Sequence, residues 1–528
     1  MNIQIIQNKL LDSKFRLAWN IISTFMVLFI FFFSFDIQRG VDMRSTNDEW
    51  EHQSLAVNYA KGYGLFKLGN FAGFDQYKID NVDATFPFLY KLFSKYPTSY
   101  FHRACGASII HGTIYKLFGV FPLFIRLFNI LLLIASWYFI VFAHRIGSNQ
   151  INVNRILQCL FPFFILINYS YVQVIGDDCL IIFVLSAIFF SSINWWNKNN
   201  LRTSILLILS LIFSLFIKST LFFLPLFILG FAIWKKRWKH VITAVSISLI
   251  LIFTVFSYSK YLNKIHHQSI YPNKQIFHSD MLQTHWSALD SLTMKQHKLE
   301  FVDDVNFGFN DYKQLATYLF ERQFYTQRFF LLSGQSWFLL IDGNNETCIS
   351  FRNKHEGSWN AAWKLYPKSF YYHYDDESSA VENVIMFYVN KFYLIPFLFY
   401  AKWYATYHWN ILFMCISIVL MYLFVKEKLN VTKPKTKFIA IVFLLIFYVT
   451  INSVFLTPFL MFFVIYLLYI NNTLFKEEFY QIVFLFSFYF LFLSTLMFGL
   501  ERYTGIANGM YLLILMNILV TRGKSSII

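Results

Sequence analysis

Residues 171–190 read YVQVIGDDCLIIFVLSAIFF, in which two adjacent acids separate two apolar runs. A helix needs about 20 apolar residues to cross a bilayer, and the segments 156–174 and 179–196 on either side of the acids approach that length. Gly and Asp are common in tight turns, because both tolerate turn conformations. These residues therefore predict two membrane-spanning helices joined by a very short turn.

The composition of the whole chain agrees with this hairpin. Of the 528 residues, 57% are hydrophobic, 21% are aromatic and only 14% are charged, and the mean hydropathy is +0.48. Soluble domains average about 25% charged residues, and small soluble cores cannot bury such an apolar excess. The composition excludes soluble, disordered, collagen-like and disulfide-scaffold proteins. It predicts an all-α polytopic membrane protein.

Apolar runs of similar length recur along the chain. The first, 16–35, follows Lys9 and Lys14 and has no small-residue cleavage site, so it predicts a retained anchor rather than a signal peptide. In all, about twelve transmembrane helices are predicted. Lys218 and Pro225 interrupt two of them, so that pair is the weakest part of the count. The other candidates are 121–143, 203–217, 219–234, 241–257, 404–425, 437–453, 454–470, 479–498 and 505–521.

The chain is strongly basic, with a net charge of +16 from 45 Lys and Arg and 29 Asp and Glu. A basic chain can bind nucleic acid, but here the basic residues lie between apolar spans, as the positive-inside rule describes. The expected environment is therefore the lipid bilayer, with no nucleic-acid partner. The pattern predicts a multi-pass membrane protein with both termini cytoplasmic, and the expected location is a bacterial inner (plasma) membrane. The basic loops contain Arg145 and Arg155, Lys198 and Arg202, KKRWKH at 235–240, KEK at 426–428, Lys476, Arg522 and Lys524.

This topology divides the chain into three parts. Residues 1–257 form an N-terminal transmembrane module, whose first external loop, 36–120, is expected to contain interfacial helices. Residues 258–403 form a small external cap inserted before the last five helices, and 404–528 form a C-terminal transmembrane module. Within the cap, 384–403 is aromatic and weakly basic, which is typical of an interfacial helix. A membrane-spanning segment is the alternative there.

Acidic residues at a membrane boundary are costly unless they are paired or functional. Asp48 and Glu49 lie in NDEWEHQSLAVNYAKG, residues 47–62, soon after the first span. They could simply begin an interfacial helix, where acids are favoured. Asp177 and Asp178 could likewise serve only as turn residues. The topology nevertheless places both acid pairs on the same external side.

Basic residues share that surface. Lys218 is a single cation in the apolar stretch SLFIKSTLFFLP, although its side chain could merely snorkel to the interface. Glu501 and Arg502, in GLERYTGIANG, fall at the external end of the penultimate span. Their alternative role is an ion pair that closes a hairpin. Together the four sites predict a shared polar cleft. Such a cleft suits a reaction in which a carboxylate deprotonates a hydroxyl and cations stabilise a phosphate leaving group.

The order of these motifs resembles the GT-C class of membrane glycosyltransferases, most of all its branch of protein O-mannosyltransferases and lipid A aminoarabinose transferases. Asp48 and Glu49 resemble the acid pair of the branch's first external loop. HGTIYKLFGVFPLFIRLFNILLL, which begins at His111, is similar to its lead into the second span. IGDDCLIIFVLSAIFF resembles its Asp-containing turn, and Lys218 stands where the branch often has a lysine. ERYTGIANGMYLL is similar to its RY-x-x-P element but lacks the proline.

The resemblance implies a GT-C-like fold and an enzyme that transfers a hexose or pentose from a polyprenyl phosphate. Asp48 would be the general base for a hydroxyl of a glycolipid, glycan or protein acceptor on the external side, with inversion. Glu49 would orient that acceptor or hold a metal. Lys218 and Arg502 would bind the donor phosphate. The residues expected around the sugar, the acceptor or a divalent cation are Asp177, Asp178, His111 and Glu501.

Two other functions fit part of the pattern. An O-antigen-type polymerase or ligase also combines about twelve spans with a large external loop, and it would use arginines of that loop such as Arg322, Arg328 and Arg352. A transporter or flippase for lipid-linked sugars would show internal repeats and ionisable residues near mid-bilayer, and the sequence indicates neither. A membrane glycosyltransferase is therefore the predicted function.

Overall fold

The computed structural model describes a helical protein, and no β-strand occurs among its described residues. The cap after residue 266, the spans 437–453 and 454–470, and most of 404–425 lie outside those residues. The described residues are 13–34, 48–62, 106–173, 175–218, 221, 223–266, 412, 415, 416, 419, 477–496, 505 and 507–525.

Helices form at each predicted apolar run within these ranges. Three segments in the described part of the chain are long and apolar enough to cross a membrane, namely Pro122–Gly147, Asp178–Lys198 and Trp238–Ser257, which supports membrane association. The helices are α2 (Ser13–Ser34), α3 (Asp48–Ala60), α5 (Gly106–Phe118), α6 (Pro122–Gly147), α7 (Ile151–Cys159), α8 (Phe161–Ile167), α9 (Tyr169–Gln173), α10 (Asp178–Lys198), α11 (Leu201–Ile217), α12 (Leu224–Trp234), α13 (Trp238–His266), α25 (Glu478–Leu496) and α27 (Asn508–Ser525).

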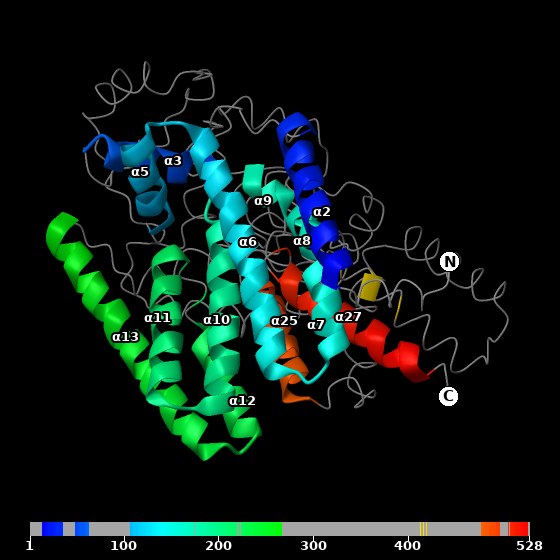
Figure 1. The fold of residues 1–528 in the computed structure, drawn as a ribbon. Helices are drawn as coiled ribbons and strands as arrows, with labels where there is room; N and C mark the ends of the chain where they lie inside the picture. The colour runs from blue at the N-terminus through cyan, green and yellow to red at the C-terminus, as the bar shows by residue number, and fades with distance from the viewer. Residues whose placement is uncertain are drawn as a thin grey trace, which may run out of the picture. The chain divides into compact units, whose positions relative to one another are not determined.

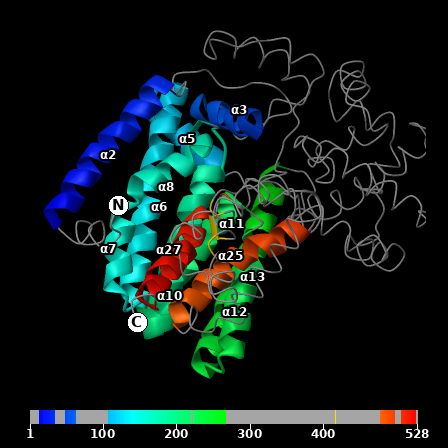
Figure 2. The same ribbon diagram turned by 90° about the vertical axis from the view of Figure 1, so that its right-hand side faces the viewer.

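The centre of the bundle is the pair α6 and α10, which pack side by side along most of their length (Figure 1, Figure 2). Trp137 of α6 and Phe189 of α10 are among the largest fully buried side chains. The ring of Phe139 lies 5.6 Å from that of Phe183, a contact that joins the two helices. Outward-facing apolar side chains such as Leu131, which is 62% exposed, suit contact with lipid tails rather than water.

The predicted span 156–174 is divided in the structure into the three short helices α7, α8 and α9. Pro162 lies in the first turn of α8, because a proline cannot continue the hydrogen bonding of the preceding helix. After α8, the Asn168 side chain donates to the Phe164 carbonyl at 2.8 Å and accepts from Asn508 of α27 at 3.0 Å. Side-chain bonds of this kind compete with regular helix bonds and allow the chain to bend.

The connections on either side of α11 follow from local sequence. Asn199 ends α10 in the left-handed conformation, with φ 38°, and Asn200 caps α11 by accepting a hydrogen bond from the Thr203 N–H at 2.9 Å. Lys218 ends α11, and α12 begins with Pro225 in its first turn. Two separate helices thus follow one another here, and their prediction as two membrane spans stays a prediction.

The chain forms two compact units, and almost all described residues belong to the first. That unit comprises Met1–Ile276, Glu477–Phe486 and Asn508–Ile528, and the second comprises Phe277–Lys476 and Ser487–Ala507. The start of α25 and all of α27 therefore pack with the N-terminal helices. The predicted divisions at 257 and 403 stay predictions.

The two ends of the first unit differ in character. The short helices α3 and α5 lie at one end, whereas the α10–α11 and α12–α13 turns lie at the other (Figure 1). These two turns contain the basic residues Lys198, Lys235, Lys236 and Arg237. The predicted external site can therefore be sought at the α3 end.

Candidate functional site

The helices α3 and α5 pack closely against each other and bring their polar side chains together. A Cβ atom on Gly112 would lie 2.6 Å from the Ala56 carbonyl oxygen and 2.8 Å from Tyr59 Cδ1, so only glycine permits this approach. A Cβ atom on Gly106, at the start of α5, would likewise clash with the Phe216 carbonyl oxygen of α11. Two glycines thus fix α5 between α3 and the end of α11.

An ion pair joins the turn before α10 to the end of α11. Lys218 Nζ donates to Asp177 Oδ2 at 2.8 Å, and both side chains are largely enclosed, with 13% and 3% exposed. Asp177 stands at the N-cap of α10 and Lys218 at the C-cap of α11. Each charge is favoured there by the helix dipole, which is positive at an N-terminus and negative at a C-terminus. The structure therefore brings together two of the predicted site residues.

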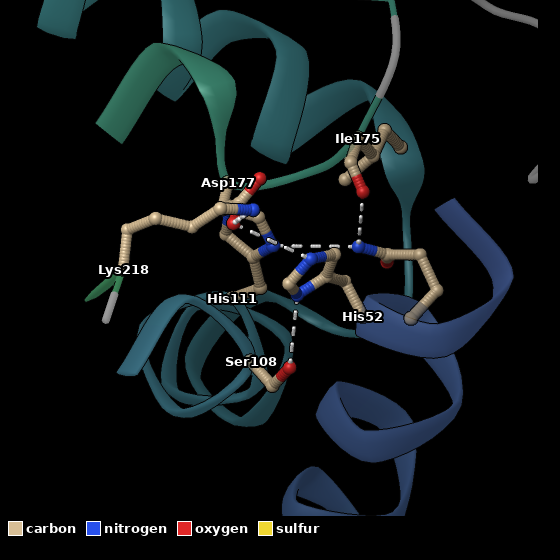
Figure 3. A network of polar contacts seen from close by, with 7 residues as sticks. His52, Ser108, His111, Ile175, Asp177 and Lys218 are labelled. Carbon is tan, nitrogen blue, oxygen red and sulfur yellow. Dashed lines mark hydrogen bonds and ion pairs between the residues drawn. The ribbon is translucent and has the colours of Figure 1, made fainter. Parts of the chain in front are cut away.

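His52 of α3 is the third member of this cluster (Figure 3). Its Nε2 lies 3.9 Å from Asp177 Oδ2, and its Nδ1 lies 3.5 Å from Ser108 Oγ of α5. The His52 side chain is only 3% exposed. Asp177 is thus flanked by a lysine on one side and an imidazole on the other.

Gln53, the residue after His52, connects α3 to the rest of the cluster. Its amide nitrogen lies 3.3 Å from both His111 Nδ1 and the Ile175 carbonyl oxygen. Tyr115 donates its hydroxyl proton to Gln53 Oε1. Because the amide nitrogen can only donate, His111 Nδ1 must accept, which requires a neutral imidazole with its proton on Nε2.

The environment of His111 favours that neutral form. The pKa of His111 is lowered from 6.5 to about 3, mainly by burial and also by nearby His52, while Asp177 acts in the opposite direction. Within the described part of the chain, no hydrogen-bond acceptor meets His111 Nε2, although this atom is buried. His111 therefore offers one unused N–H donor in the interior of the cluster.

The predicted catalytic acids stand at the beginning of α3. The helix starts at Asp48, so Asp48 and Glu49 precede His52 and Gln53 by four residues each, about one helical turn. Asp178 lies buried in the first turn of α10, next to Asp177. Glu501 and Arg502 are outside the described residues. The fold therefore brings the acid-bearing helix, Asp177, His111 and Lys218 to one place.

Sequence reasoning missed His52, Gln53, Ser108 and Tyr115. A signal for the first two exists, because they repeat the spacing of four residues from Asp48 and Glu49 on a predicted helix. Ser108 and Tyr115 have no comparable signal, since nothing in the sequence tells which residues of α5 face α3. As for a metal, the described residues contain no group of three or more His, Cys, Asp or Glu side chains placed to hold one.

No family model, curated protein or solved structure matches this chain. Function must therefore be argued from the chemistry of the site itself rather than from related proteins. The site combines a buried Lys–Asp pair, two imidazoles and a helix that begins with two acids. Such a set can hold an anion, orient hydroxyl groups and accept a proton.

Proposed function

We propose that the protein is a membrane glycosyltransferase that moves a sugar from a polyprenyl phosphate to a hydroxyl acceptor on the external side of the membrane. The observation that carries this proposal is the Asp177–Lys218 pair, held against the helix that begins with Asp48 and Glu49. It supports the proposal because it puts a buried ion pair against α3, through His52, at one end of an apolar bundle. The bundle itself suits a lipid-linked donor.

Lys218 is proposed to bind the donor phosphate. Lys218 donates to Asp177, and an ammonium group can donate to more than one acceptor. The Lys218 side chain is more exposed than that of Asp177, 13% against 3%. Asp177 then acts as a positioning residue for the lysine. Arg502 is the proposed second cation.

Asp48 is proposed as the base of the transfer step. It removes the proton from the acceptor hydroxyl, whose oxygen attacks the anomeric carbon while the bond from that carbon to the phosphate oxygen breaks. The polyprenyl phosphate leaves with the electron pair, and Lys218 stabilises its developing charge. Direct displacement inverts the anomeric configuration. Glu49 orients the acceptor or holds a divalent cation.

The remaining site residues are proposed to bind the sugar and the acceptor. His111 offers its Nε2–H as a hydrogen-bond donor, which a sugar oxygen can accept. Asp178 and Glu501 would accept hydrogen bonds from sugar hydroxyls or ligate a cation. The proposal places the enzyme in a bacterial inner membrane, with both termini cytoplasmic and a glycolipid, glycan or protein as acceptor.

The test measures sugar transfer by the purified protein with Asp48→Asn and with Lys218→Gln. A panel of polyprenyl-phosphate hexoses and pentoses serves as donor, release of polyprenyl phosphate is measured, and glycans from cells with and without the gene are compared by mass spectrometry. We expect Asp48→Asn to lower kcat at least 100-fold, since general-base catalysis contributes about 10²–10⁴-fold. Lys218→Gln should lower kcat in addition to raising KM.

The matched control is Lys116→Gln, which removes an exposed cation from the outer face of α5. It should retain wild-type turnover. Turnover above a tenth of wild type in a properly inserted Asp48→Asn variant would exclude Asp48 as the base. Absence of transfer from every donor, together with unchanged cell glycans, would argue against a glycosyltransferase altogether.

A transporter is the second candidate, because one observation favours it. His52, His111, Asp177 and Lys218 are enclosed among helices, and buried ionisable residues in membrane proteins commonly serve proton or substrate movement. A transporter would move a lipid-linked sugar between leaflets of a vesicle without releasing polyprenyl phosphate. The transfer assay therefore separates the two functions.

A further inference from the structure

A second polar site lies at the end of the first unit opposite α3 and α5, where the α10–α11 and α12–α13 turns meet. A surface pocket of about 380 Å³ opens there. We call it the turn pocket. Its lining includes Lys198, Asn199, Arg237, Trp238, Lys239 and His240.

Arg237 is held in a fixed position in the turn pocket. Its Nη2 is 2.5 Å from Glu478 Oε2, and its guanidinium lies 4.5 Å from the centre of the Trp196 ring. The Trp196 Nε1–H donates to the same carboxylate oxygen at 2.9 Å. One face of the pocket is therefore built from an arginine that stacks on Trp196 and pairs with Glu478.

Two lysines give the pocket its net positive charge. Lys198 and Lys239 are both exposed, and within the described part of the chain neither has an ion-pair partner. Glu478 is already engaged by Arg237 and Trp196. An anion entering the pocket would thus meet two lysines that have no competing carboxylate among the described residues.

The surroundings of the pocket match a membrane surface. Trp234 and Trp238 are each 66% exposed, and Ile242, one turn into α13, is 68% exposed. Exposed tryptophans next to lysines and apolar helix faces are typical of the level of lipid headgroups. A soluble anion would not require this apolar border, whereas the acyl chains of a lipid would use it.

We propose that the turn pocket binds the phosphate headgroup of an anionic membrane lipid in the leaflet opposite the candidate catalytic site. Lys198 and Lys239 contact the phosphate oxygens, Arg237 supplies the rigid wall, and Trp238 borders the glycerol region. The site is separate from the proposed transfer reaction and does not depend on it. Binding in the turn pocket differs from binding to a diffuse positive surface, because it depends on Lys198 and Lys239 rather than on the summed charge.

The test is native mass spectrometry of the full-length protein, titrated in detergent with phosphatidylglycerol or with phosphatidylcholine. Wild type should retain phosphatidylglycerol in preference to phosphatidylcholine. The double variant Lys198→Gln/Lys239→Gln should bind phosphatidylglycerol about tenfold more weakly. The matched control Lys235→Gln/Lys236→Gln removes the same amount of charge from the α12–α13 turn, outside the pocket lining, and should bind as wild type does.

Equal weakening in the two double variants would show that only the summed charge matters and would overturn the pocket assignment. Unchanged phosphatidylglycerol binding in Lys198→Gln/Lys239→Gln would also overturn the pocket assignment. Inorganic phosphate is added as a competitor in a parallel titration. If phosphate displaces the lipid at concentrations similar to those of the lipid itself, the pocket is a soluble-anion site and the lipid assignment fails. Matching thermal unfolding of all variants confirms that folding is not the cause.

Discussion

Asp177 and Lys218 form an ion pair in a place where charges are costly. Removing charges from water has a desolvation cost that their mutual attraction often fails to offset. Here the ends of two helices reduce that cost, since Asp177 stands at a helix N-terminus and Lys218 at a C-terminus. His52, 3.9 Å from the same carboxylate oxygen, adds a further polar neighbour. A buried ion pair of this kind is typical of functional sites in membrane proteins.

His111 predicts a specific pH dependence of stability. Its folded-state pKa is lowered to about 3 from 6.5, mainly by burial, so below pH 6.5 the unfolded chain takes up a proton that the folded chain excludes. Stability should therefore fall as the pH drops from 6.5 towards 3, by up to about 1.4 kcal/mol per pH unit from this residue. His111→Gln, which can still accept the Gln53 hydrogen bond, should flatten that slope in thermal unfolding.

The comparison is between slopes, so a general loss of stability in His111→Gln does not obscure the result. If both proteins lose stability in parallel between pH 6.5 and 4, His111 is protonated without penalty in the folded state. In that case the neutral tautomer assigned from Gln53 would be wrong.

At the scale of elements, the site depends on the approach of α3 to α5. Gly112→Ala would place a methyl group 2.6 Å from the Ala56 carbonyl oxygen and should force the helices apart. We expect a loss of about 1–3 kcal/mol in unfolding free energy, as for other overpacked contacts. We also expect a drop in activity, because His52 and Gln53 would move away from Asp177 and His111. Thermal unfolding and the transfer assay measure both effects.

Gly230→Ala is the control for this prediction. Gly230 lies within α12, and a Cβ there meets no atom within 4 Å. Alanine is the better helix former by about 1 kcal/mol, so this variant should be neutral or more stable. Similar destabilisation by the two substitutions would show that close packing of α3 on α5 is not the cause.

At the scale of the whole molecule, the topology predicts that the two ends of the first unit lie on opposite sides of the membrane. Single cysteines can test this in a variant whose five native cysteines are replaced. Lys61→Cys, at the exposed end of α3, should react with a membrane-impermeant maleimide in intact spheroplasts. Lys236→Cys, in the exposed α12–α13 turn, should react only after permeabilisation. Labelling of both before permeabilisation would contradict the predicted orientation.

Much of the helical framework could be predicted from the sequence, because apolar run length determines where a membrane helix can form. The run at 121–143 became α6, and the run at 179–196 became α10. The run at 156–174 became three short helices, since Pro162 and Asn168 act on backbone hydrogen bonding, which hydropathy does not measure. Predictions for the cap and for Arg502 lie outside the described residues.

The sequence by itself determined a helical membrane protein and singled out Asp177, His111 and Lys218, because composition, hydropathy and isolated charges are local properties. Only the tertiary structure decided which of these side chains meet. Lys218 contacts Asp177 across 41 positions in the chain, and Gln53 meets His111 across 58. Such contacts depend on helix packing, including the close approach at Gly112, which is set by the shapes of several surfaces at once. That His52 lies beside Asp177 therefore follows only from the packing of α3 against α5 and the turn before α10.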